Sequence, residues 1–544
     1  MDVQQNNHSI PRPLTLDCFE EIIAYLIDDP GTLYSCLLVN RLWCRIAIPL
    51  LWSRPFEYHG FGKPAADIIQ TYISCLPEGE KQILIDEGLL KLPPLHNPLF
   101  DYPKYLKSFE SAHFTGAVLS WLSKRVKSWL SLIERQEEHD DTYLIQNVIG
   151  NLLFSRSRGL RDLEIVHFDE DDYSLISDII SFDDANKALS RLEKFQFEYS
   201  GWEDQGEKPS EIISELFNFM SQCTRNIQHI CINIDIFDQD SGISEVTRSF
   251  ARLIESQKYL KELVISKFWC PSAAPVLFKT LVSQANTLIY LEIRELHQDQ
   301  FQSLLDILPA LENLETLQFC NFSGDHDESL KVSTRVTGPI NIKHLHYKAK
   351  KSQVDIVNFM ESLLQMAGGN LRTLLLECVT SELVFLIGQN CPNLTHLSLS
   401  LTTQEIPDTI FSLLSTMNNL QHFSLYIYFS DCPFSTTEDL LRFSLSIPPS
   451  LLYFGFYLAI TPDILEYLLK YCRAKFQVLA VYRPKVNDNN LIPVITNYAL
   501  KYGSLRKLLI DLDVYHDESE TVEEAKKVIP IVDKIIDTSY PFSG

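Results

Sequence analysis

The sequence predicts an α/β repeat fold, a solenoid in which short strands form the inner layer and helices form the outer layer. The main observation is a six-residue frame, apolar-x-x-apolar-x-apolar, that recurs thirteen times. The first residues of the copies are Leu160, Leu192, Ile227, Leu260, Leu288, Leu314, Ile342, Leu371, Leu394, Leu420, Leu451, Phe476 and Leu505. Their steps average about 29 residues, and a fixed period indicates stacked repeats because one short strand cannot bury its apolar face alone.

A helix-compatible segment after each frame is the second observation behind this fold. The clearest expected helices cover residues 211–223, 245–257, 299–308, 354–366, 382–390 and 461–472. A strand followed by a helix in every repeat gives a curved stack with strands inside. The ninth position of the frame differs between copies, so we expect no asparagine ladder and no uniform turn.

The length and the net charge of the chain limit its domain organisation and the kinds of partner it can bind. The chain has 544 residues, more than one compact core holds, so several domains or a repeat array are expected. The formal net charge of −24 disfavours nucleic acid and anionic membranes as partners, because most of the surface would repel them. A basic partner is compatible with this charge, although acidity that only keeps a large protein soluble explains it more simply.

Nothing in the sequence predicts a secreted or membrane protein. Residues 1–13 are polar and contain proline, unlike a leader peptide, and the apolar run at 451–460 is too short to cross a bilayer. Twelve cysteines lie far apart without a zinc-binding spacing and are expected to be reduced thiols. We therefore expect a cytoplasmic or nuclear protein, or one present in both compartments.

The N-terminal region carries the pattern of three short helices. A flexible tail is expected at residues 1–12, and the helical unit at residues 13–56. Thr32 is expected to cap the second helix. Asn40 is expected to begin the third helix and Pro49 to end it.

Three stretches of this unit, residues 14–26, 33–43 and 50–52, form an ordered string of matches to one family. The second contains Val39-Asn40-Arg41-Leu42-Trp43, and the third ends in Leu51-Trp52. This string resembles an F-box, which usually begins with Leu-Pro, has a central Val-Cys/Asn-Arg-x-Trp element and closes near Leu-Trp. Thr15 stands where the family has proline. An unrelated helical bundle is the alternative, because patterning alone readily yields three amphipathic helices.

The resemblance implies that the unit docks a Skp-type adaptor and, through it, a cullin–RING ubiquitin ligase. The adaptor-binding residues implied are Leu14, Leu16, Ile22, Leu26, Leu38, Trp43, Leu51 and Trp52. Which of them face the adaptor and which fill the core of the unit is left open by the sequence.

The repeat region also has a recognisable junction. Residues 388–394, Gly-Gln-Asn-Cys-Pro-Asn-Leu, resemble the helix-to-strand junction of leucine-rich repeats in F-box proteins, with Pro392 ending the helix. Residues 160–519 are therefore expected to form a leucine-rich-repeat solenoid of about thirteen repeats.

Both ends of the array are expected to be capped, as repeat arrays require. Residues 57–159 are expected to form a helical connector that is also the N-terminal cap, with a helix at 118–133. Residues 520–544 are expected to form a C-terminal capping helix, over 520–537, and a tail.

Alternation along the strands predicts a binding surface. The third, fifth and seventh residues of each frame should face the concave side. In the last copies these positions include His396, His422, Tyr426, Tyr453, Tyr457 and Tyr482. Since adjacent strands lie about 4.8 Å apart, we expect one patch that binds a protein substrate of unknown identity. Alternatively, the tyrosines are only good strand formers. No metal is expected, because the histidines lack a third ligand at a fixed spacing.

The familiar catalytic motifs are missing from the sequence, among them Gly-x-Ser-x-Gly, Gly-x-Gly-x-x-Gly, the Walker loop and His-Glu-x-x-His. We expect no catalytic residue and no cofactor. By resemblance, the chain is expected to be the substrate-recognition subunit of a Skp–cullin–F-box ubiquitin ligase. Two alternatives stay open: an acidic leucine-rich-repeat binding or inhibitor protein with no ubiquitin role, and an enzyme whose chemistry lies within residues 57–159.

Overall fold

The structure is a computed structural model of the chain. It describes residues 16–57, 63–90, 98–124, 137–167, 174–201, 209–236, 242–266, 274–296, 300–321, 335–336, 338–349, 356–401, 403, 406–427, 433–434, 436–457, 460–482, 491–510 and 520–534. The chain folds into two compact units, Met1–Leu260 and Lys261–Gly544, and each unit is described by itself.

The first unit begins with three short helices, α1 (Leu16–Ala24), α2 (Pro30–Leu37) and α3 (Arg41–Leu51). Their small buried core consists of Ile23, Leu33, Cys36 and Ala47. Half-buried apolar side chains pack around this core, so each helix contributes one apolar face, as amphipathic patterning requires.

Local hydrogen bonds set the starts of α2 and α3. Asn40 begins α3 as expected, since its Oδ1 accepts the N–H of Trp43 at 3.0 Å. The expected cap of α2 is wrong: Asp29 caps it, because its Oδ1 accepts the Thr32 N–H at 3.0 Å. Pro49 does not end α3, which continues to Leu51 because the residues after the proline pack on the core of the three helices.

The connector region holds helices and one unexpected strand. Its elements are α4 (Lys63–Cys75), α5 (Glu78–Asp86), the 3₁₀ helix η1 (Tyr102–Tyr105), β1 (Ser108–Glu110), α6 (Ser111–Ser123) and α7 (Glu137–Arg156). Strand β1 pairs in parallel with β2 (Asp162–His167) and places Phe109 opposite Leu163. Three residues are too few to show a periodicity, so the sequence pattern missed this strand. The expected helix at 118–133 instead ends within the described part at Ser123.

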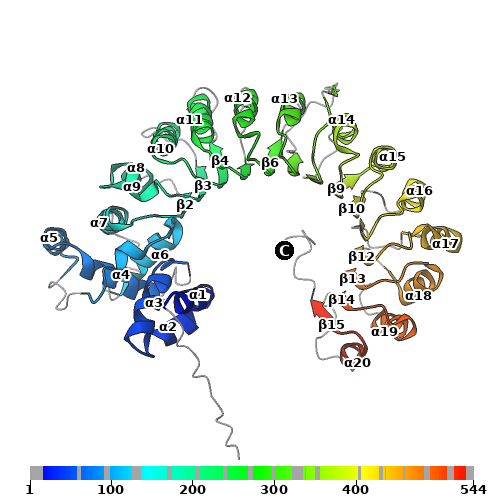
Figure 1. Cartoon of the computed structure of the whole chain (residues 1–544), viewed down its shortest axis with the longest axis horizontal. Coiled ribbons are helices and arrows are strands. Elements are labelled where there is room, and N and C mark those ends of the chain that lie inside the picture. The colour runs from blue at the N-terminus through cyan, green and yellow to red at the C-terminus, as the bar shows by residue number, and fades with distance from the viewer. Residues whose placement is uncertain are drawn as a thin grey trace, which may run out of the picture. The chain divides into compact units, whose positions relative to one another are not determined.

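The rest of the first unit alternates helices and strands. In chain order these are β2, α8 (Ser174–Ser181), α9 (Ala185–Leu189), β3 (Lys194–Gly201), α10 (Pro209–Cys223), β4 (His229–Ile236) and α11 (Gly242–Ser256). The strands pair in parallel, β1 with β2, β2 with β3 and β3 with β4. The helices lie on the opposite side of the strands from the inner face (Figure 1).

The second unit repeats the same alternation. Its strands are β5 (Glu262–Ser266), β6 (Tyr290–Leu296), β7 (Thr316–Asn321), β8 (His344–Ala349), β9 (Thr373–Val379), β10 (His396–Leu401), β11 (His422–Ile427), β12 (Tyr453–Tyr457), β13 (Val478–Tyr482), β14 (Lys507–Ile510) and β15 (Ile531–Lys534). Its α-helices are α12 (Ala274–Leu281), α13 (Phe301–Ile307), α14 (Val357–Ala367), α15 (Ser381–Asn390), α16 (Asp408–Thr416), α17 (Thr437–Ser446), α18 (Pro462–Tyr471), α19 (Leu491–Tyr502) and α20 (Glu520–Val528). Short 3₁₀ turns follow α12 and α13 at Val282–Gln284 and Leu308–Ala310.

Every strand of the second unit pairs in parallel with the next one along the chain. Within this unit the strands line the inner side of an arc and the helices its outer side (Figure 1). The α/β repeat part of the predicted fold is therefore confirmed, with strands inside and helices outside.

The core lies between the strands and the helices. Register places the sixth residue of successive frames side by side, as in Leu399, Leu425 and Phe456, and these side chains are at most 1% exposed. The first and fourth residues of the frames are buried in the same way. All apolar positions of the frame point into this one layer. The period of the frame is therefore kept although the residues at its other positions vary widely.

A ladder of asparagines joins repeats of the second unit, at the position before each frame and not at the ninth position, where none was expected. Each asparagine stands directly before the first apolar residue of a frame and donates its Nδ2–H to a backbone oxygen of the preceding repeat. The four are Asn313 to Asn286 (2.7 Å), Asn341 to Glu312 (3.0 Å), Asn370 to Ile340 (2.9 Å) and Asn393 to Gly369 (2.9 Å). The ladder satisfies turn carbonyls that the strands leave unpaired.

The C-terminal cap differs from the expected helix over 520–537. Helix α20 ends at Val528, and residues 531–534 form β15, which pairs in parallel with β14. Pro530 explains the difference, because the residue before a proline disfavours the helical conformation. The region 520–534 therefore adds one more strand to the second unit.

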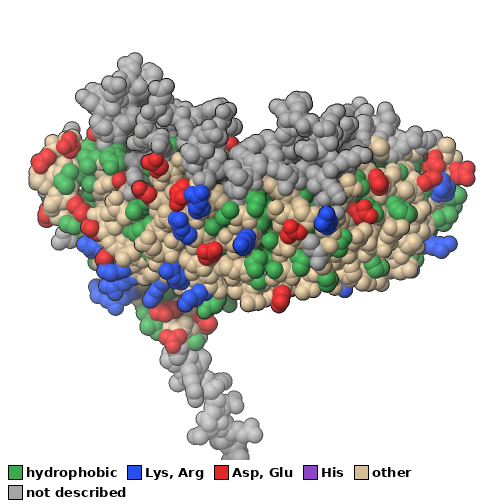
Figure 2. Space-filling model, turned by 90° about the horizontal axis from the view of Figure 1, so that it is seen from above, with side chains coloured by type: hydrophobic (Ala, Val, Ile, Leu, Met, Phe, Trp, Pro, Cys, Tyr) green, Lys and Arg blue, Asp and Glu red, His purple; other side chains and the backbone are tan. Residues whose placement is uncertain are grey.

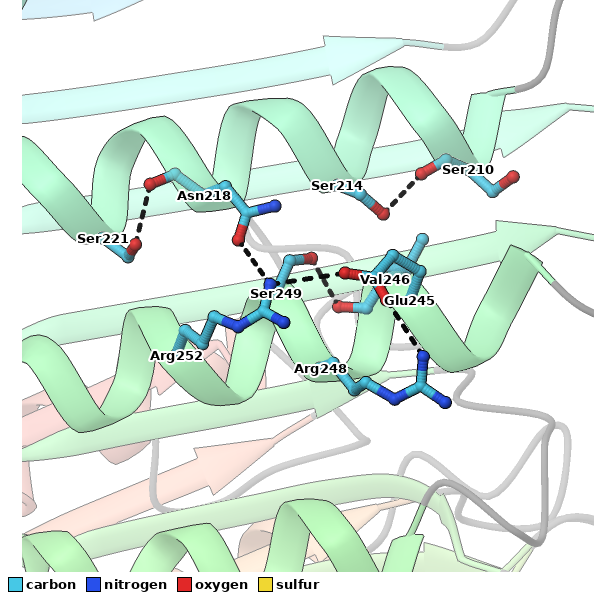
Figure 3. A network of polar contacts seen from close by, with 9 residues as sticks. All are labelled: Ser210, Ser214, Asn218, Ser221, Glu245, Val246, Arg248, Ser249 and Arg252. Atoms are coloured by element: carbon cyan, nitrogen blue, oxygen red, sulfur yellow. Dashed lines mark hydrogen bonds and ion pairs between the residues drawn. The ribbon is translucent and has the colours of Figure 1, made fainter.

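On the outer layer of the first unit, polar contacts join α10 to α11 (Figure 3). Arg252 donates to Asn218 Oδ1 at 2.9 Å and pairs with Glu245 at 3.3 Å. Arg248 pairs with the same carboxylate at 3.0 Å. The cations of this helix face are thus partnered by groups on the same two helices.

Candidate protein-binding surfaces

The three N-terminal helices leave a large apolar surface in water. Seven side chains on them or in their turns are 44% to 87% exposed: Leu16, Ile22, Tyr25, Tyr34, Leu38, Val39 and Leu42. Leu38 and Val39 lie directly before the Asn40 cap of α3, and Leu42 lies in the first turn of that helix. Exposed apolar groups gathered in one small unit mark an interaction surface, and we call these seven residues the exposed helix face.

The predicted adaptor-binding residues divide into an exposed and a packed group. The exposed group is Leu16, Ile22 and Leu38. The packed group is Leu26, Trp43 and Leu51, which lie against the core of the three helices, and Trp52, which is half-buried. These four side chains serve the packing of the unit, since three short helices have few large groups with which to build a core. Leu14 lies outside the described residues.

Trp52 attaches the three helices to the elements that follow. Its ring centroid lies 5.3 Å from that of Tyr72 in α4 and 4.3 Å from that of Tyr102 in η1. Beside Trp52 is a pocket of about 340 Å³, and the exposed Tyr34 contributes to its lining. The other apolar residues that line it are Pro30, Leu51, Pro55 and Ile68. This pocket has room for an apolar side chain of another protein.

In the second unit, the inner face of β10–β12 stacks the predicted imidazole and aromatic rings. His396 lies opposite His422, and His422 lies opposite Tyr453. The two imidazole centroids are 4.0 Å apart, and the His422 and Tyr453 centroids are 5.4 Å apart, with nearly parallel planes. We call this row the imidazole stack.

A second row of rings runs beside the imidazole stack. The Tyr426 and Tyr457 centroids are 3.9 Å apart, with an interplanar angle of 10°. Gly455 makes room for this stack, because an added Cβ would lie 2.9 Å from the Tyr457 ring. Tyr482 continues the row in backbone register with Tyr457, and its side chain lies outside the described part of the structure.

The stacked rings leave less open surface than the sequence predicted. The Tyr426 and Tyr457 side chains are 8% and 6% exposed, and the rings of the imidazole stack are half-buried. Rings that stack face to face cover one another, so a partner would meet mainly their edges. The structure brings the predicted residues together, but as two packed rows and not as an open aromatic patch.

Burial keeps this face uncharged near neutral pH. It lowers the pKa of His422 to about 4, and the neighbouring His396 imidazole adds to the shift. Burial likewise lowers the pKa of His396, with a smaller contribution from His344. Burial also raises the pKa of the Tyr453 hydroxyl. The described inner-face positions of β10–β12 contain no Asp, Glu, Lys or Arg, so this face is neutral in a chain of net charge −24.

The inner face of the first unit has the opposite character. A pocket of about 300 Å³ on β1–β3 is lined by Glu110, Asp162, Glu164 and Lys194, among others. Burial raises the pKa of Asp162 and of Glu164, and nearby cations offset part of each shift. This surface is charged and suits polar contacts.

The described residues contain neither a metal-binding group nor a membrane-spanning helix. No group of three or more His, Cys, Asp or Glu side chains there is placed to hold a metal ion. None of the helices in the described ranges is both long enough and apolar enough to cross a membrane.

Comparison with known proteins gives only distant likenesses. No protein-family model matches the chain, and no curated protein matches it. A chain in the crystal structure of the Rad7 and Elc1 complex in yeast is 14% identical, covering 72% of this chain and 92% of its own, with a TM-score of 0.35. The leucine-rich repeat-containing protein LegL7 from Legionella pneumophila is 13% identical, covering 62% and 90% respectively, with a TM-score of 0.33. Neither likeness is close enough to assign a family or a function.

Sequence reasoning missed parts of these surfaces. Four residues of the exposed helix face were not among the predicted residues: Tyr25, Tyr34, Val39 and Leu42. The asparagine ladder had a visible signal in the sequence, an Asn directly before the frame in five successive copies, from Asn313 to Asn419. The exposed helix face had no such signal, because patterning does not tell which apolar residues a three-helix unit buries.

Proposed function

We propose that this chain is a substrate receptor of a Skp–cullin–F-box ubiquitin ligase, with α1–α3 as its F-box. The observation that carries the proposal is the exposed helix face, seven large apolar side chains on a unit whose sequence resembles an F-box. The Asn40 cap and the packed Trp43 give the motif residues structural roles. A Skp-type adaptor would cover the exposed face and link the chain to the cullin–RING enzyme.

In this role the repeats hold a target protein and contribute no chemistry. The receptor would raise the local concentration of target lysines near a ubiquitin-carrying enzyme, and catalysis would occur on another subunit. The neutral inner face of β10–β13 and the charged inner face of β1–β3 are the two surfaces available for the target. The chain would need neither cofactor nor metal, and it would act in the cytoplasm or nucleus, on proteins and not on nucleic acid or membranes.

The test is a pull-down of the full chain with a purified Skp adaptor. An Ile22→Asp/Leu38→Asp variant should lose adaptor binding, because two charges would enter the buried centre of the interface. The matched control is Phe385→Asp/Leu500→Asp, which changes two exposed apolar residues on the outer helices α15 and α19. This control should bind as the parent does, and thermal melting should show both variants folded.

No binding by the folded parent chain would contradict the proposal. Equal binding by the parent and the Ile22→Asp/Leu38→Asp variant would contradict the assigned surface. The first result would favour the acidic binding protein, in which the three helices only cap the repeats.

A further inference from the structure

A row of exposed cations runs along one edge of the first unit, where turns lead into the strands. Each cation stands at the start of a strand or in the turn before it, from β1 to the end of the unit. The seven residues are Lys107, Arg158, Arg161, Arg191, Lys194, Arg225 and Lys258, and all are exposed. We call them the basic edge.

Backbone hydrogen bonds make the basic edge continuous. The Arg161 N–H donates to the Lys107 oxygen at 2.8 Å, and the Lys194 N–H donates to the Arg161 oxygen at 2.9 Å. Further along, the Lys258 N–H donates to the Arg225 oxygen at 3.0 Å. Neighbouring parallel strands are about 4.8 Å apart, so five such turns span roughly 20 Å.

Few carboxylates neutralise these cations. In these turns and at the first residues of the strands that follow them, three residues are acidic, Asp162, Glu193 and Glu262, so seven cations face three carboxylates. Glu193 pairs with Arg161 at 3.6 Å. Asp162 is half-buried, with Lys194 and Arg161 among the cations that act on it.

Most side chains of the basic edge have no polar partner in the part of the chain that the structure describes. Within the described ranges, Lys107, Arg158, Arg191 and Lys258 make no ion pair and no side-chain hydrogen bond. Arg248 and Arg252 on α11 of the same unit are both paired, as Figure 3 shows. Figure 2 shows Lys and Arg side chains gathered along the lower left edge of the surface, whereas both signs of charge alternate over its middle. The basic edge therefore presents cations that are available to a partner protein, in contrast to the paired arginines of α11.

We infer that the basic edge binds an acidic polypeptide segment of a partner protein, rich in Asp and Glu. Its span of roughly 20 Å corresponds to about six residues of extended chain. Arginine side chains bind carboxylates with two parallel hydrogen bonds, which gives such a segment both affinity and register. Nucleic acid fits less well, because a longer polyanion would run from this short edge onto the surface of a chain with net charge −24.

This binding site is separate from the proposed adaptor site and does not depend on it. The edge begins next to the end of α3, where the Lys107 N–H donates to the Ser53 oxygen at 2.9 Å. An acidic segment bound there would lie beside the three helices and leave the inner faces of the strands open.

The probe is a fluorescein-labelled twelve-residue peptide of alternating Glu and Ser, titrated with the full chain and followed by fluorescence anisotropy. We expect binding at low salt that weakens severalfold as the salt concentration approaches physiological. An Arg158→Gln/Arg191→Gln/Lys258→Gln variant should bind the peptide about tenfold more weakly, because each exposed charge contact contributes a modest amount. These side chains make no ion pair and no side-chain hydrogen bond among the described residues, so the melting temperature should stay near that of the parent.

The matched control removes three exposed cations from the corresponding turns of the second unit, in the variant Arg473→Gln/Lys475→Gln/Arg506→Gln. It should weaken peptide binding less than twofold. An equal loss in both variants would show that the peptide follows total charge, and the inference would be wrong. Tighter binding of a labelled twelve-nucleotide thymidine strand than of the peptide would also overturn it, as would equal binding of a Gln-Ser peptide.

Discussion

The inner face of β1–β3 in the first unit and that of β10–β12 in the second share a backbone arrangement and differ in chemistry. In β2 and β3 the positions that point inward hold Glu164 opposite Gln196, next to Asp162 and Lys194. In β10–β12 the corresponding positions hold stacked imidazole and phenol rings without a formal charge. In both sets the strands pair in parallel, with equivalent frame positions opposite each other on neighbouring strands. Both sets also bury the apolar positions of the frame.

This difference shows which positions of the repeat must be apolar and which positions can vary. The frame needs apolar side chains only on the side of each strand that faces the helices, because alternation places the others outside the core. Inner-face residues can therefore be carboxylates in β1–β3 and rings in β10–β12 without a change of backbone. The same holds for the turns before the strands, which carry cations in the first unit and asparagines in part of the second.

Shortening a core side chain should have the largest effect, and an equal one in both units. Phe197→Ala in β3 and Leu425→Ala in β11, at most 1% exposed, should each lower the free energy of unfolding by about 2–5 kcal/mol. The inner-face substitutions Gln196→Ala and Ser398→Ala should cost less than about 1 kcal/mol. Denaturant titration measures both. Similar losses for core and inner-face variants would mean that the inner faces belong to the core.

The asparagine ladder should contribute less, and only where a hydrogen bond is made. Asn370→Ala removes a donor to the Ile340 oxygen and should lower the free energy of unfolding by about 1–2 kcal/mol. Asn419 stands at the same place before its frame but makes no side-chain hydrogen bond within the described residues, so Asn419→Ala should change little. Equal losses measured by denaturant titration would show that position, and not the bond, matters.

Acid should act on the two inner faces with opposite signs. Burial holds the pKa of His422 at about 4 against an ordinary 6.5, so the unfolded state binds more protons, and stability falls as pH drops through this window. Burial raises the pKa of Asp162 above 3.8 and of Glu164 above 4.5, so the protonated forms favour the folded state and stability is lost as pH rises through the raised values.

Thermal melting between pH 4 and 7 tests these signs. The variant His396→Gln/His422→Gln should lose less stability on acidification than the parent. The variant Asp162→Asn/Glu164→Gln should lose more, because it lacks the groups that favour the folded state in acid. Each difference should be about 1 kcal/mol or less, since the groups are half exposed to solvent. Parallel pH profiles for all three proteins would refute the contrast between the faces.

The smallest effect is expected on the outer layer. Arg252→Ala breaks the contact with Asn218 that joins α10 to α11 and the ion pair with Glu245 within α11. It should cost no more than about 0.5 kcal/mol because both interactions are open to solvent. Denaturant titration beside the parent measures this loss. A loss as large as that of the asparagine variant would show that the outer polar network contributes as much as the ladder to holding neighbouring repeats together.

Much of the fold could be predicted from the sequence, whereas the candidate surfaces could be predicted only in part. The frame predicted the strands from residue 160 onward and the order of the helices, because its period is carried by residues that must be buried. It missed β1 and β15, since Ser108–Glu110 is short and Ile531–Lys534 follows a helical pattern that Pro530 interrupts. It placed His396, His422 and Tyr453 on one face, but it gave no sign that stacking would half-bury their rings.

By itself, the sequence determined the alternation of strand and helix, the three N-terminal helices and the Asn40 cap, because these depend on spacing along the chain and on hydrogen bonds between near neighbours. Only the tertiary structure decided that Leu38 is exposed while Trp43 packs inward, and that Arg158, Arg191 and Lys258 follow one another along one edge. Both outcomes depend on which distant residues meet. A sequence pattern shows where apolar and charged residues recur along the chain. Which residues lie beside them in space is determined by tertiary packing.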